Sequence, residues 1–367
     1  MTVGIVGGGQ LARMMALAGY RLGLDFLSLD KDPCTPAAQV APALSGSFTD
    51  PTLLDELAHR SEVVTFDWEN VPLESLDRIA GRVRIAPPRE ALAAARDRLN
   101  EKTLFDALRI PTNRHAAVDS EADLAAAVSR LGLPGVLKTR SLGYDGKGQF
   151  VLRKPADIAA AWARLGSNAP LLYEEFVPFD YEVSIIGVRG RDGAIRTWPL
   201  NRNLHADGVL RLTRAPWRAP ALEAAAVRHV RRVLKHFDYV GVLTIEFFVR
   251  RGRLLANEMA PRVHNSGHWT IEGAMTSQFE NHVRAILGLP LGDTAPRGHS
   301  AMINLLGTMP PREALLAEKS LFLHDYGKEP RPGRKLGHCT LVAASAAERD
   351  RRAASLLRRL DSRKIAG

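Results

Sequence analysis

Two carboxylates on a predicted β-hairpin are the residues of this chain best suited to chemistry. Val242–Val249 is rich in β-branched and aromatic residues, which is typical of a strand, and Leu254–Met259 is predicted as the return strand. A pairing centred on Gly252 places Glu246 opposite Glu258, because each lies six positions from that glycine. Cross-strand neighbours have Cβ atoms roughly 5 Å apart. Two carboxylates at that distance repel unless a cation lies between them, and Mg²⁺ completed by substrate phosphates fits this arrangement.

The same spacing also fits two solvated glutamates on an exposed hairpin. The neighbours of Glu246 favour a site, because Ile245, Phe247 and Phe248 are not the usual setting of a charge in water. The segment Asn257–His268 that follows contains amide, arginine and histidine side chains. Together these features point to magnesium, phosphate and an anionic substrate, and therefore to ATP-driven ligation.

Three consecutive glycines, Gly7–Gly9, follow the first predicted strand and open a helix. With Ala12 they give the spacing G-x-G-x-x-A, and Asp30 ends the second predicted strand, so the segment imitates a dinucleotide fingerprint. Taken alone, it supports an NAD-dependent dehydrogenase. The signal is weak, because any glycine turn at a helix start offers N–H groups to an anion. A site for another nucleotide's phosphate and a tight turn without a ligand both stay open.

A second glycine-rich stretch, Ser141–Gln149, follows a predicted strand that carries Lys138. Such loops expose N–H donors and fold over polyphosphate, although this one is not a Walker A sequence. The alternative is a mobile surface hairpin. Lys138 lies among apolar residues, where an ammonium group needs a partner, and a phosphate would serve. Farther along, Tyr173–Val177 turns abruptly from apolar to acidic, and such a strand end could bind an adenine edge while Glu182 binds ribose; a solvated strand end is the alternative.

Cationic side chains gather in two other segments. Arg262, His264 and His268 follow the hairpin, and the loop Lys328–Lys335 presents four cations on a turn fixed by prolines and Gly333. Arginine forks suit phosphate or carboxylate. Because the two histidines lie on a loop rather than on a helix, we do not expect them to bind zinc.

The elements that must position these residues alternate strand and helix over the first ~100 residues, the pattern of a parallel α/β layer. The predicted strands are Val3–Val6, Phe26–Leu29, Val63–Phe66 and Val83–Ala86. A helix is expected from an N-cap at Asn100 to Leu108. The next segment, about 113–176, is expected to contain helix Glu121–Leu131, strand Val136–Thr139, a further strand and helix, and strand Leu171–Phe176. A strand-rich segment follows and closes with helix Ala346–Leu360.

Length and composition bound the possible functions. The 367 residues suggest two or three domains, with 46% hydrophobic and 25% charged residues. No apolar run approaches the ~20 residues that cross a bilayer. The two cysteines, Cys34 and Cys339, form no close pair, which favours a reducing cytosol. The net charge of +10 could indicate nucleic-acid binding, but the basic residues are spread along the chain without aromatic interleaving. We therefore expect neither a nucleic acid nor a membrane as partner.

The chain resembles the ATP-grasp superfamily and, within it, the family of 5-(carboxyamino)imidazole ribonucleotide synthases. The resemblance covers nearly the whole length, and one departure from the family pattern is Asp67, where glutamate is frequent. The segments that carry the resemblance are Gly9–Leu11, Glu69–Val71, Gly143–Gln149, Asn203–His205, Asn257–Trp269 and Arg331–His338.

This resemblance implies an α/β fold with an amino-terminal parallel α/β domain (1–98), a small lid region (99–176) and a carboxyl-terminal α+β domain (177–367). It also implies the nucleotide site. Arg98 and Lys138 would meet the phosphates of ATP, and the lid loop would comprise Gly143, Tyr144, Asp145, Gly146, Lys147, Gly148 and Gln149. Adenine would be held by Glu174, Glu175, Phe176 and Val177, ribose by Glu182, and the site would be completed by His205, Asn257 and Glu258. Glu246 and Glu258 would carry Mg²⁺.

The implied reaction is the carboxylation of 5-aminoimidazole ribonucleotide by ATP and bicarbonate through carboxyphosphate, in a cytoplasmic enzyme of purine biosynthesis that forms a homodimer. Arg262 and His264 would orient the carboxyl donor, while Asp145 and Lys147 approach the aminoimidazole. The ribonucleotide would be held by Gln10, Leu11, Glu69, Tyr144, Lys328, Arg334 and Lys335. Strict strand alternation points Asn257 away from Glu258, so a bulge or a strand end must turn it inward.

Overall fold

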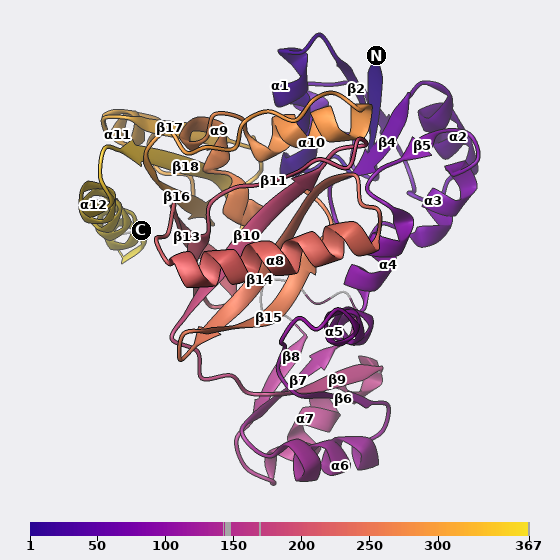
Figure 1. The fold of residues 1–367 in the computed structure, drawn as a ribbon, viewed down its shortest axis with the longest axis vertical. Coiled ribbons are helices and arrows are strands. Elements are labelled where there is room, and N and C mark those ends of the chain that lie inside the picture. Colours follow the sequence, from indigo (N-terminus) through magenta and orange to yellow (C-terminus); the bar gives the residue numbers. More distant parts are fainter. Residues whose placement is uncertain (142, 144–147, 169, 366–367) are drawn as a thin grey trace.

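The structure is a computed structural model that describes residues 1–141, 143, 148–168 and 170–365. Its strands form three separate sheets that follow one another along the chain (Figure 1). In the described part of the chain, no helix combines the length and the hydropathy needed to cross a membrane. The chain contains both sheets and helices, as the predicted α/β class requires. The three sheets converge on one site.

The first sheet is parallel, as predicted, with strand order β3-β2-β1-β4-β5. Its central strands β1 and β4 are almost wholly buried, because helices cover both faces of a parallel sheet. Strand β3 was not predicted, since its three residues are too few to show a pattern. The strands are β1 (Thr2–Val6), β2 (Asp25–Asp30), β3 (Ala43–Ser45), β4 (Val63–Phe66) and β5 (Arg84–Ile85), and the helices are α1 (Gln10–Tyr20), η1 (Ala37–Gln39), α2 (Pro51–His59), α3 (Leu73–Ile79) and α4 (Arg89–Arg96).

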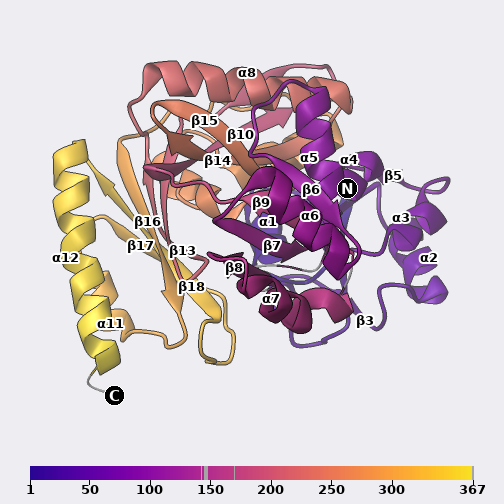
Figure 2. The same ribbon diagram turned by 90° about the horizontal axis from the view of Figure 1, so that it is seen from below.

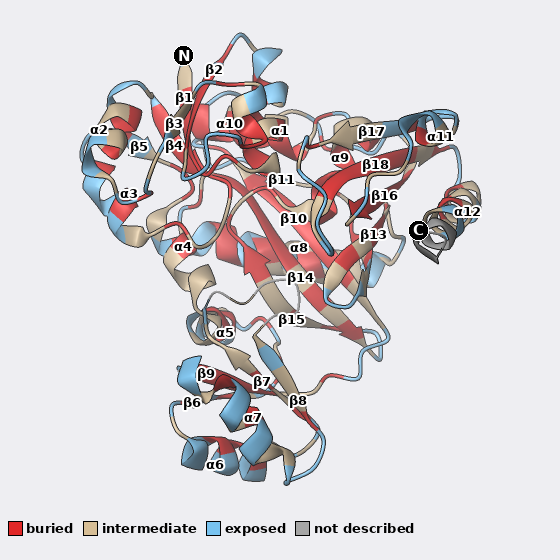
Figure 3. Cartoon of the chain, turned by 180° about the vertical axis from the view of Figure 1, so that it is seen from behind, coloured by how far each residue is buried: buried red, intermediate tan, exposed pale blue. Residues whose placement is uncertain are grey.

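The second sheet is small and antiparallel, with order β6-β9-β7-β8. It projects from the rest of the molecule in Figure 1, and the outer faces of its helices are exposed in Figure 3. The predicted helix α6 has the expected bounds, whereas β6 was not predicted. The elements are β6 (His115–Val118), α6 (Glu121–Leu131), β7 (Gly135–Thr139), β8 (Gln149–Leu152), α7 (Asp157–Leu165), η2 (Gly166–Asn168) and β9 (Leu171–Glu175).

The third sheet comprises nine strands of the described chain, in the order β15-β14-β10-β12-β13-β16-β18-β17 with β11 paired to β10. Helix α8 covers β10 and β14, and α12 covers β16 and β18 at the far edge (Figure 2). The strands are β10 (Tyr181–Arg189), β11 (Ile195–Thr197), β12 (Asn201–Ala206), β13 (Val209–Ala215), β14 (Gly241–Arg250), β15 (Arg253–Ala260), β16 (His299–Leu306), β17 (Leu321–Asp325) and β18 (Lys335–Ala343). The helices are α8 (Pro220–His236), η3 (Asn265–Gly267), α9 (Thr270–Gly273), α10 (Gln278–Leu287), α11 (Arg312–Leu316) and α12 (Ala346–Ile365).

The helix that joins the first two sheets begins earlier than predicted. Helix α5 spans Arg98–Ala107, and its N-cap is Asp97, whose carboxylate accepts hydrogen bonds from the N–H groups of Leu99 and Asn100. Asn100 is therefore not the cap. Both residues are good N-caps, and Asp97 is the one because Arg140 also binds its carboxylate.

The first sheet is attached to the third through helix α10. This helix packs on α1 and on β14. The buried ring of His282 on α10 accepts a hydrogen bond from the Val242 N–H through Nδ1 and lies 3.0 Å from the Thr65 hydroxyl through Nε2. Because burial lowers the pKa of His282 to about 3, the ring is neutral and can make both contacts. The ring thus ties β4 to β14 behind the site.

Candidate active site

A cavity of about 740 Å³ lies where the three sheets meet. The sequence-predicted residues that line it come from all three units of the chain, and no single motif could form it. They are Gln10, Leu11, Glu69, Arg98, Lys138, Gly143, Gln149, Glu182, His205, Glu246, Asn257, Glu258, Arg262, His264 and Lys335.

The hairpin that carries the two carboxylates pairs Glu246 with Glu258, as predicted. The pairing is not centred on Gly252, however. The turn consists of Arg251 and Gly252, both at positive φ (49° and 72°), which is the two-residue geometry that matches strand twist. A register shift next to Glu246 leaves Asn257 as an extra residue, and this bulge restores the predicted carboxylate pair.

The bulge also resolves the orientation of Asn257. Phe247 pairs with Ala256 and Glu246 pairs with Glu258, so Asn257 has no partner residue across the hairpin. Asn257 and Glu258 both line the cavity although they are consecutive residues. Strict alternation would point Asn257 and Glu258 to opposite faces of the strand. The bulge interrupts this alternation at Asn257.

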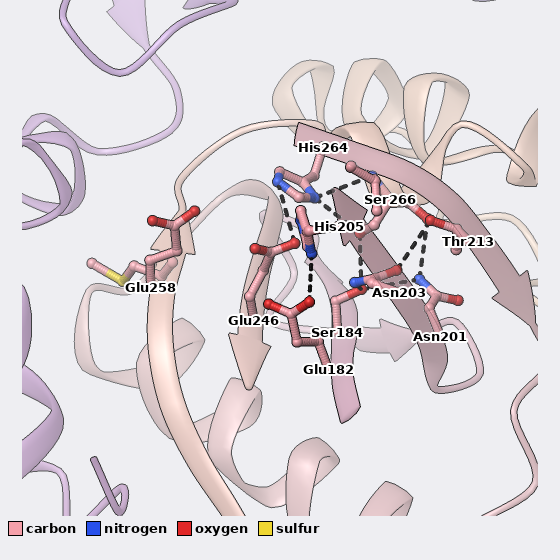
Figure 4. Close-up of polar contacts among 12 residues, drawn as sticks. Glu182, Ser184, Asn201, Asn203, His205, Thr213, Glu246, Glu258, His264 and Ser266 are labelled. Atoms are coloured by element: carbon pink, nitrogen blue, oxygen red, sulfur yellow. Dashed lines mark hydrogen bonds and ion pairs between the residues drawn. The ribbon is translucent and has the colours of Figure 1, made fainter. Parts of the chain in front are cut away.

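Glu246 lies in a group of polar side chains on neighbouring strands. Figure 4 shows its carboxylate beside Glu182, His205 and His264. Burial, with the charges of Glu258 and Glu182 added, raises the pKa of Glu246 to about 7 although the His205 charge opposes the shift. Its Oε1 is buried, accepts no hydrogen bond from the residues that the structure describes, and lies 3.9 Å from Nε2 of His264. Such a carboxylate oxygen is chemically suited to a cation.

Glu258 is held ionised by cations. Burial raises its pKa, but the charges of Arg98 and Lys138 outweigh burial and lower the pKa below its ordinary value. One guanidinium nitrogen of Arg98 lies 3.3 Å from Oε2 of Glu258, and the other donates to the Gly143 carbonyl. Arg98 therefore joins the predicted metal ligand to the loop predicted to cover phosphate.

The two carboxylates fit Mg²⁺ only together with other ligands. In the part of the chain that the structure describes, no cluster of three or more histidine, cysteine, aspartate or glutamate side chains has a metal-binding arrangement. Magnesium commonly takes one or two carboxylates and completes its shell with water and substrate phosphates. The unpartnered Oε1 of Glu246 and the ionised Glu258 match that donor set.

Lys138 has a protein partner, which the sequence did not reveal. Its ammonium lies 2.7 Å from Oε2 of Glu174, a residue predicted to hold adenine. Glu174 is 2% exposed and also accepts from the amide of Asn113. Although burial by itself raises the pKa of Glu174, Lys102 and Lys138 hold it well below its ordinary range. The Glu174 side chain is thus engaged by lysines rather than free to bind adenine.

The remaining residues of the predicted adenine segment lie at the end of β9. Glu175 pairs with Arg114, and Val177 is buried. Neither they nor Phe176 line the cavity. The lid-loop residues Tyr144, Asp145, Gly146 and Lys147 lie outside the described residues, whereas Gly148 is described and has a positive φ of 70°.

His205 and Glu182 form a pair on adjacent strands. Nδ1 of His205 lies 2.8 Å from Oε2 of Glu182. Burial lowers the pKa of His205, but the hydrogen bond to Glu182 and the charge of Glu246 outweigh burial and raise the pKa to about 9. His205 is therefore an imidazolium at neutral pH and adds a positive charge beside the two metal-binding candidates.

Arg262 and His264 also line the cavity, and His264 lies close to Glu246. Arg262 pairs with Glu69 of the first unit and donates to the Val263 carbonyl. His264 is half-buried, and desolvation followed by the nearby charge of Arg262 lowers its pKa well below the ordinary value. The side-chain amide of Gln278 makes two hydrogen bonds to the backbone N–H and C=O of His264. The position of His264 is thus fixed by a residue outside the predicted set.

The cationic loop, Lys328–Lys335, contacts the first unit of the chain. Lys328 donates to the side-chain carbonyl of Gln10, and Arg334 donates to the Glu329 carbonyl. Burial, with the charge of Arg334 added, lowers the pKa of Lys328 to about 8. Gln10 and Lys335 line the cavity, whereas Lys328 and Arg334 do not.

The glycine turn after β1 does not offer free N–H groups to a dinucleotide. The Gly8 N–H donates to Asp30 and the Gly9 N–H donates to Asp67, both at 2.7 Å. Burial, with the charge of Asp30 added, raises the pKa of Asp67 to about 6. Two carboxylates thus occupy the donors that a pyrophosphate would need, which argues against the NAD-dependent alternative.

Sequence reasoning missed two buried charges on α5. Lys102, 1% exposed, donates to the carbonyls of Ala256 and Asn257 and to Thr112 and Asn113. Glu101 accepts from the Met259 N–H, and burial together with the charge of Glu258 raises its pKa to about 8. In the sequence, only their position on a helix that also carries Arg98 could have indicated a role. Charged residues on such a helix are usually interpreted as a solvated face.

Comparisons with known families agree with this geometry. A model described as the ATP-grasp domain matches residues 103–279, and one described as the ribonucleotide synthetase preATP-grasp domain matches residues 1–96. A third, the phosphoribosylaminoimidazole carboxylase C-terminal domain, matches residues 300–352. The chain is thus an ATP-grasp protein of the ribonucleotide-synthetase type.

The relatives make the assignment more specific. An N5-carboxyaminoimidazole ribonucleotide synthase of Pseudomonas aeruginosa is 52% identical over 347 residues, covering 95% of this chain and 96% of that protein. The crystal structure of a synthetase of that name from Thermus thermophilus has a TM-score of 0.93 at 49% identity, covering 97% of this chain and 98% of that chain. The crystal structure of an N5-carboxyaminoimidazole synthase from Aspergillus clavatus, in complex with ADP and 5-aminoimidazole ribonucleotide, has a TM-score of 0.91 at 31% identity. The match covers 98% of each chain.

The chain therefore belongs to the N5-carboxyaminoimidazole ribonucleotide synthase family, which is the family that the sequence motifs indicated. The comparisons confirm the predicted family and the predicted fold class. They also confirm, at the level of the family, the prediction of an ATP-dependent carbon–nitrogen ligase.

Proposed function

We propose that this chain carboxylates the amine of 5-aminoimidazole ribonucleotide with ATP and bicarbonate, giving the carboxyamino product, ADP and phosphate. The observation that carries the proposal is that one cavity joins the Glu246–Glu258 pair to the Arg262–His264 wall. A bicarbonate oxygen forms a bond to the γ-phosphorus as the bond to ADP breaks. The substrate amine then forms a bond to the carboxyl carbon of carboxyphosphate as phosphate leaves.

The nucleotide half of the site is assigned to the third sheet and the lid. Arg98, Lys138 and the loop 143–149 bind the phosphates. The backbone of Glu174–Val177 takes adenine, Glu182 takes ribose, and His205 and Asn257 complete the site. Phosphoryl transfer depends mainly on positioning and on charge neutralisation, which these cations supply.

Magnesium is assigned to Glu246 and Glu258 together with the nucleotide phosphates. When bound, the ion neutralises charge on the transferring phosphoryl group. The chain's own contribution is to hold one ionised carboxylate, Glu258, between Arg98 and Lys138 and to keep Oε1 of Glu246 without a protein donor.

The acceptor half of the site is assigned to the first unit and the cationic loop. Gln10, Leu11, Glu69, Lys328, Arg334 and Lys335, with Tyr144, bind the ribonucleotide. Arg262 and His264 orient the carboxyl donor, and Asp145 and Lys147 approach the reacting amine. Closure of the lid excludes water, which would hydrolyse carboxyphosphate.

A coupled assay of ADP release tests the proposed reaction. Release should require bicarbonate and 5-aminoimidazole ribonucleotide together, and each omission should reduce it to background. Equal ADP release with glycinamide ribonucleotide and formate would instead assign the chain to a different ligation.

We further propose that the protein is cytoplasmic and forms a homodimer. Each chain would be divided into three units, 1–98, 99–176 and 177–367. Cys34 and Cys339 are free thiols, which is compatible with a reducing compartment. Light scattering during size-exclusion chromatography tests the dimer, since a mass near 40.2 kDa would indicate a monomer.

A further inference from the structure

A row of buried polar side chains leads from the core of the third sheet to the ring of His264 (Figure 4). The Thr213 hydroxyl donates to Oδ1 of Asn203, whose amide donates to Ser184 at 3.0 Å. The hydroxyls of Ser184 and Ser266 lie 2.8 Å apart, and that of Ser266 lies 2.9 Å from Nδ1 of His264. These residues belong to β10, β12, β13 and η3, so the row crosses the sheet beneath the cavity.

The amide groups fix the direction of these hydrogen bonds. The Asn201 amide nitrogen is identified because it donates to the Ser266 carbonyl, which can only accept. It also lies 3.4 Å from the Ser184 hydroxyl, which the Asn203 amide approaches as well. Because Ser184 accepts from amides, its own proton points to Ser266. The proton of Ser266 must then point to His264.

The backbone gives the same result independently. The Ser266 N–H donates to Nδ1 of His264 at 3.2 Å. A backbone N–H is always a donor, so Nδ1 must be an unprotonated acceptor. The single proton of the neutral ring is therefore on Nε2, the nitrogen that lies 3.9 Å from Oε1 of Glu246 in the cavity.

We infer that Ser266 and Ser184 are positioning residues that lock His264 in the tautomer with the proton on Nε2. In this state His264 donates a hydrogen bond into the cavity and cannot remove a proton there. Resting on the proposed function, the inference assigns His264 as the donor to an oxygen of the bicarbonate or carboxyphosphate group. The proton lost by the substrate amine must go to another acceptor.

The tautomer can be measured without activity. Nitrogen-15 spectra of the protein labelled on histidine should show Nδ1 of His264 as the unprotonated type and Nε2 as the protonated type, with the signals assigned by their loss in His264→Asn. The reverse pattern would overturn the inference, whatever substrates the protein turns over. Failure of the coupled assay with the expected pattern present would reject the proposed function instead.

Kinetics separate positioning from a structural role. Ser266→Ala keeps the backbone N–H donor but removes the hydroxyl, and Ser184→Ala removes the next donor in the row. Each should raise KM for bicarbonate about fivefold, the factor that one ordinary hydrogen bond is worth, while KM for ATP stays the same. Ser184→Thr, which retains a hydroxyl, should restore most of the bicarbonate KM.

Ser300→Ala is the matched control. Ser300 is fully buried on β16, and its hydroxyl has no hydrogen-bond partner among the described residues. This variant should leave both KM values unchanged. If Ser266→Ala and Ser184→Ala fold with wild-type melting temperatures and keep the wild-type KM for bicarbonate, the positioning role is rejected.

Discussion

Three buried or half-buried glutamates close to one hairpin have different protonation behaviour. Arg98 and Lys138 lower the pKa of Glu258, whereas burial raises those of Glu246 to about 7 and Glu101 to about 8. Glu258 differs from the other two because the charges of Arg98 and Lys138 act on it and because its side chain is 41% exposed. Perturbed acids of this kind are typical of sites that bind charged ligands.

Glu258→Gln should lower kcat about 100-fold or more, because the amide keeps the shape of the side chain but loses the charge that binds Mg²⁺. ADP release measured over a magnesium titration checks this. The control is Glu121→Gln, which changes an exposed carboxylate on α6. Wild-type turnover of Glu258→Gln at low magnesium would remove Glu258 from the metal site.

Glu101→Gln should stabilise the free protein at high pH. The pKa of Glu101 rises from 4.5 to about 8 on folding, so between these values the folded chain binds a proton that the unfolded chain has lost. Wild-type stability therefore falls as pH rises through this window, and glutamine removes the loss. Urea unfolding should show the variant more stable by roughly 1–3 kcal/mol at pH 8 and equal near pH 4.5. A difference that does not change with pH would contradict the assignment.

At the scale of elements, the decisive feature is the bulge in β15. A regular hairpin from the Arg251–Gly252 turn would pair Glu246 with Asn257, and the extra residue brings Glu258 opposite Glu246 instead. Lys102 on α5 binds both carbonyls at the bulge, those of Ala256 and Asn257. We infer that this buried ammonium holds the Glu246–Glu258 pair, the candidate metal ligands, in register.

Lys102→Met should lower the free energy of unfolding by about 3 kcal/mol or more, because it leaves Glu174 with one lysine and frees two buried carbonyls. Thermal unfolding followed by circular dichroism measures this. Lys154→Met removes an exposed lysine of the lid and serves as control. A melting temperature for Lys102→Met equal to that of Lys154→Met would show that the bulge does not depend on Lys102.

At the scale of the whole molecule, the residues proposed for the two kinds of ligand come largely from different units of the chain. The candidate nucleotide residues lie on the lid and on β10, β12 and the hairpin, whereas Gln10 and Glu69 come from the first unit. The Arg262–Glu69 pair joins the first unit to the segment after the hairpin. Changes at Gln10 or Glu69 should therefore act on one substrate only.

Glu69→Gln should raise KM for 5-aminoimidazole ribonucleotide about fivefold or more, since it loses the ion pair with Arg262 at the predicted ribonucleotide site. KM for ATP should change by less than about twofold. Initial rates with each substrate varied in turn give both values. An equal rise in both constants would show that the two halves of the cavity are not separate.

The sequence determined the local features of this protein. Strand and helix alternation, the bounds of α6 and the long motifs followed from the chain, because each depends on residues close together in sequence. The Glu246–Glu258 pair was predicted from a wrong turn centre, and the bulge at Asn257 is what restores it. The family resemblance depends on such segments too, and it was confirmed.

Only the tertiary structure decided which charges meet. Asp97 rather than Asn100 caps α5, Lys138 pairs with Glu174, and the glycine turn donates to Asp30 and Asp67. The partners of Lys138 and of the two glycines lie between 22 and 58 residues away in the chain. Whether an ammonium meets a carboxylate, a phosphate or water depends on how separate elements pack, and no local pattern contains that information.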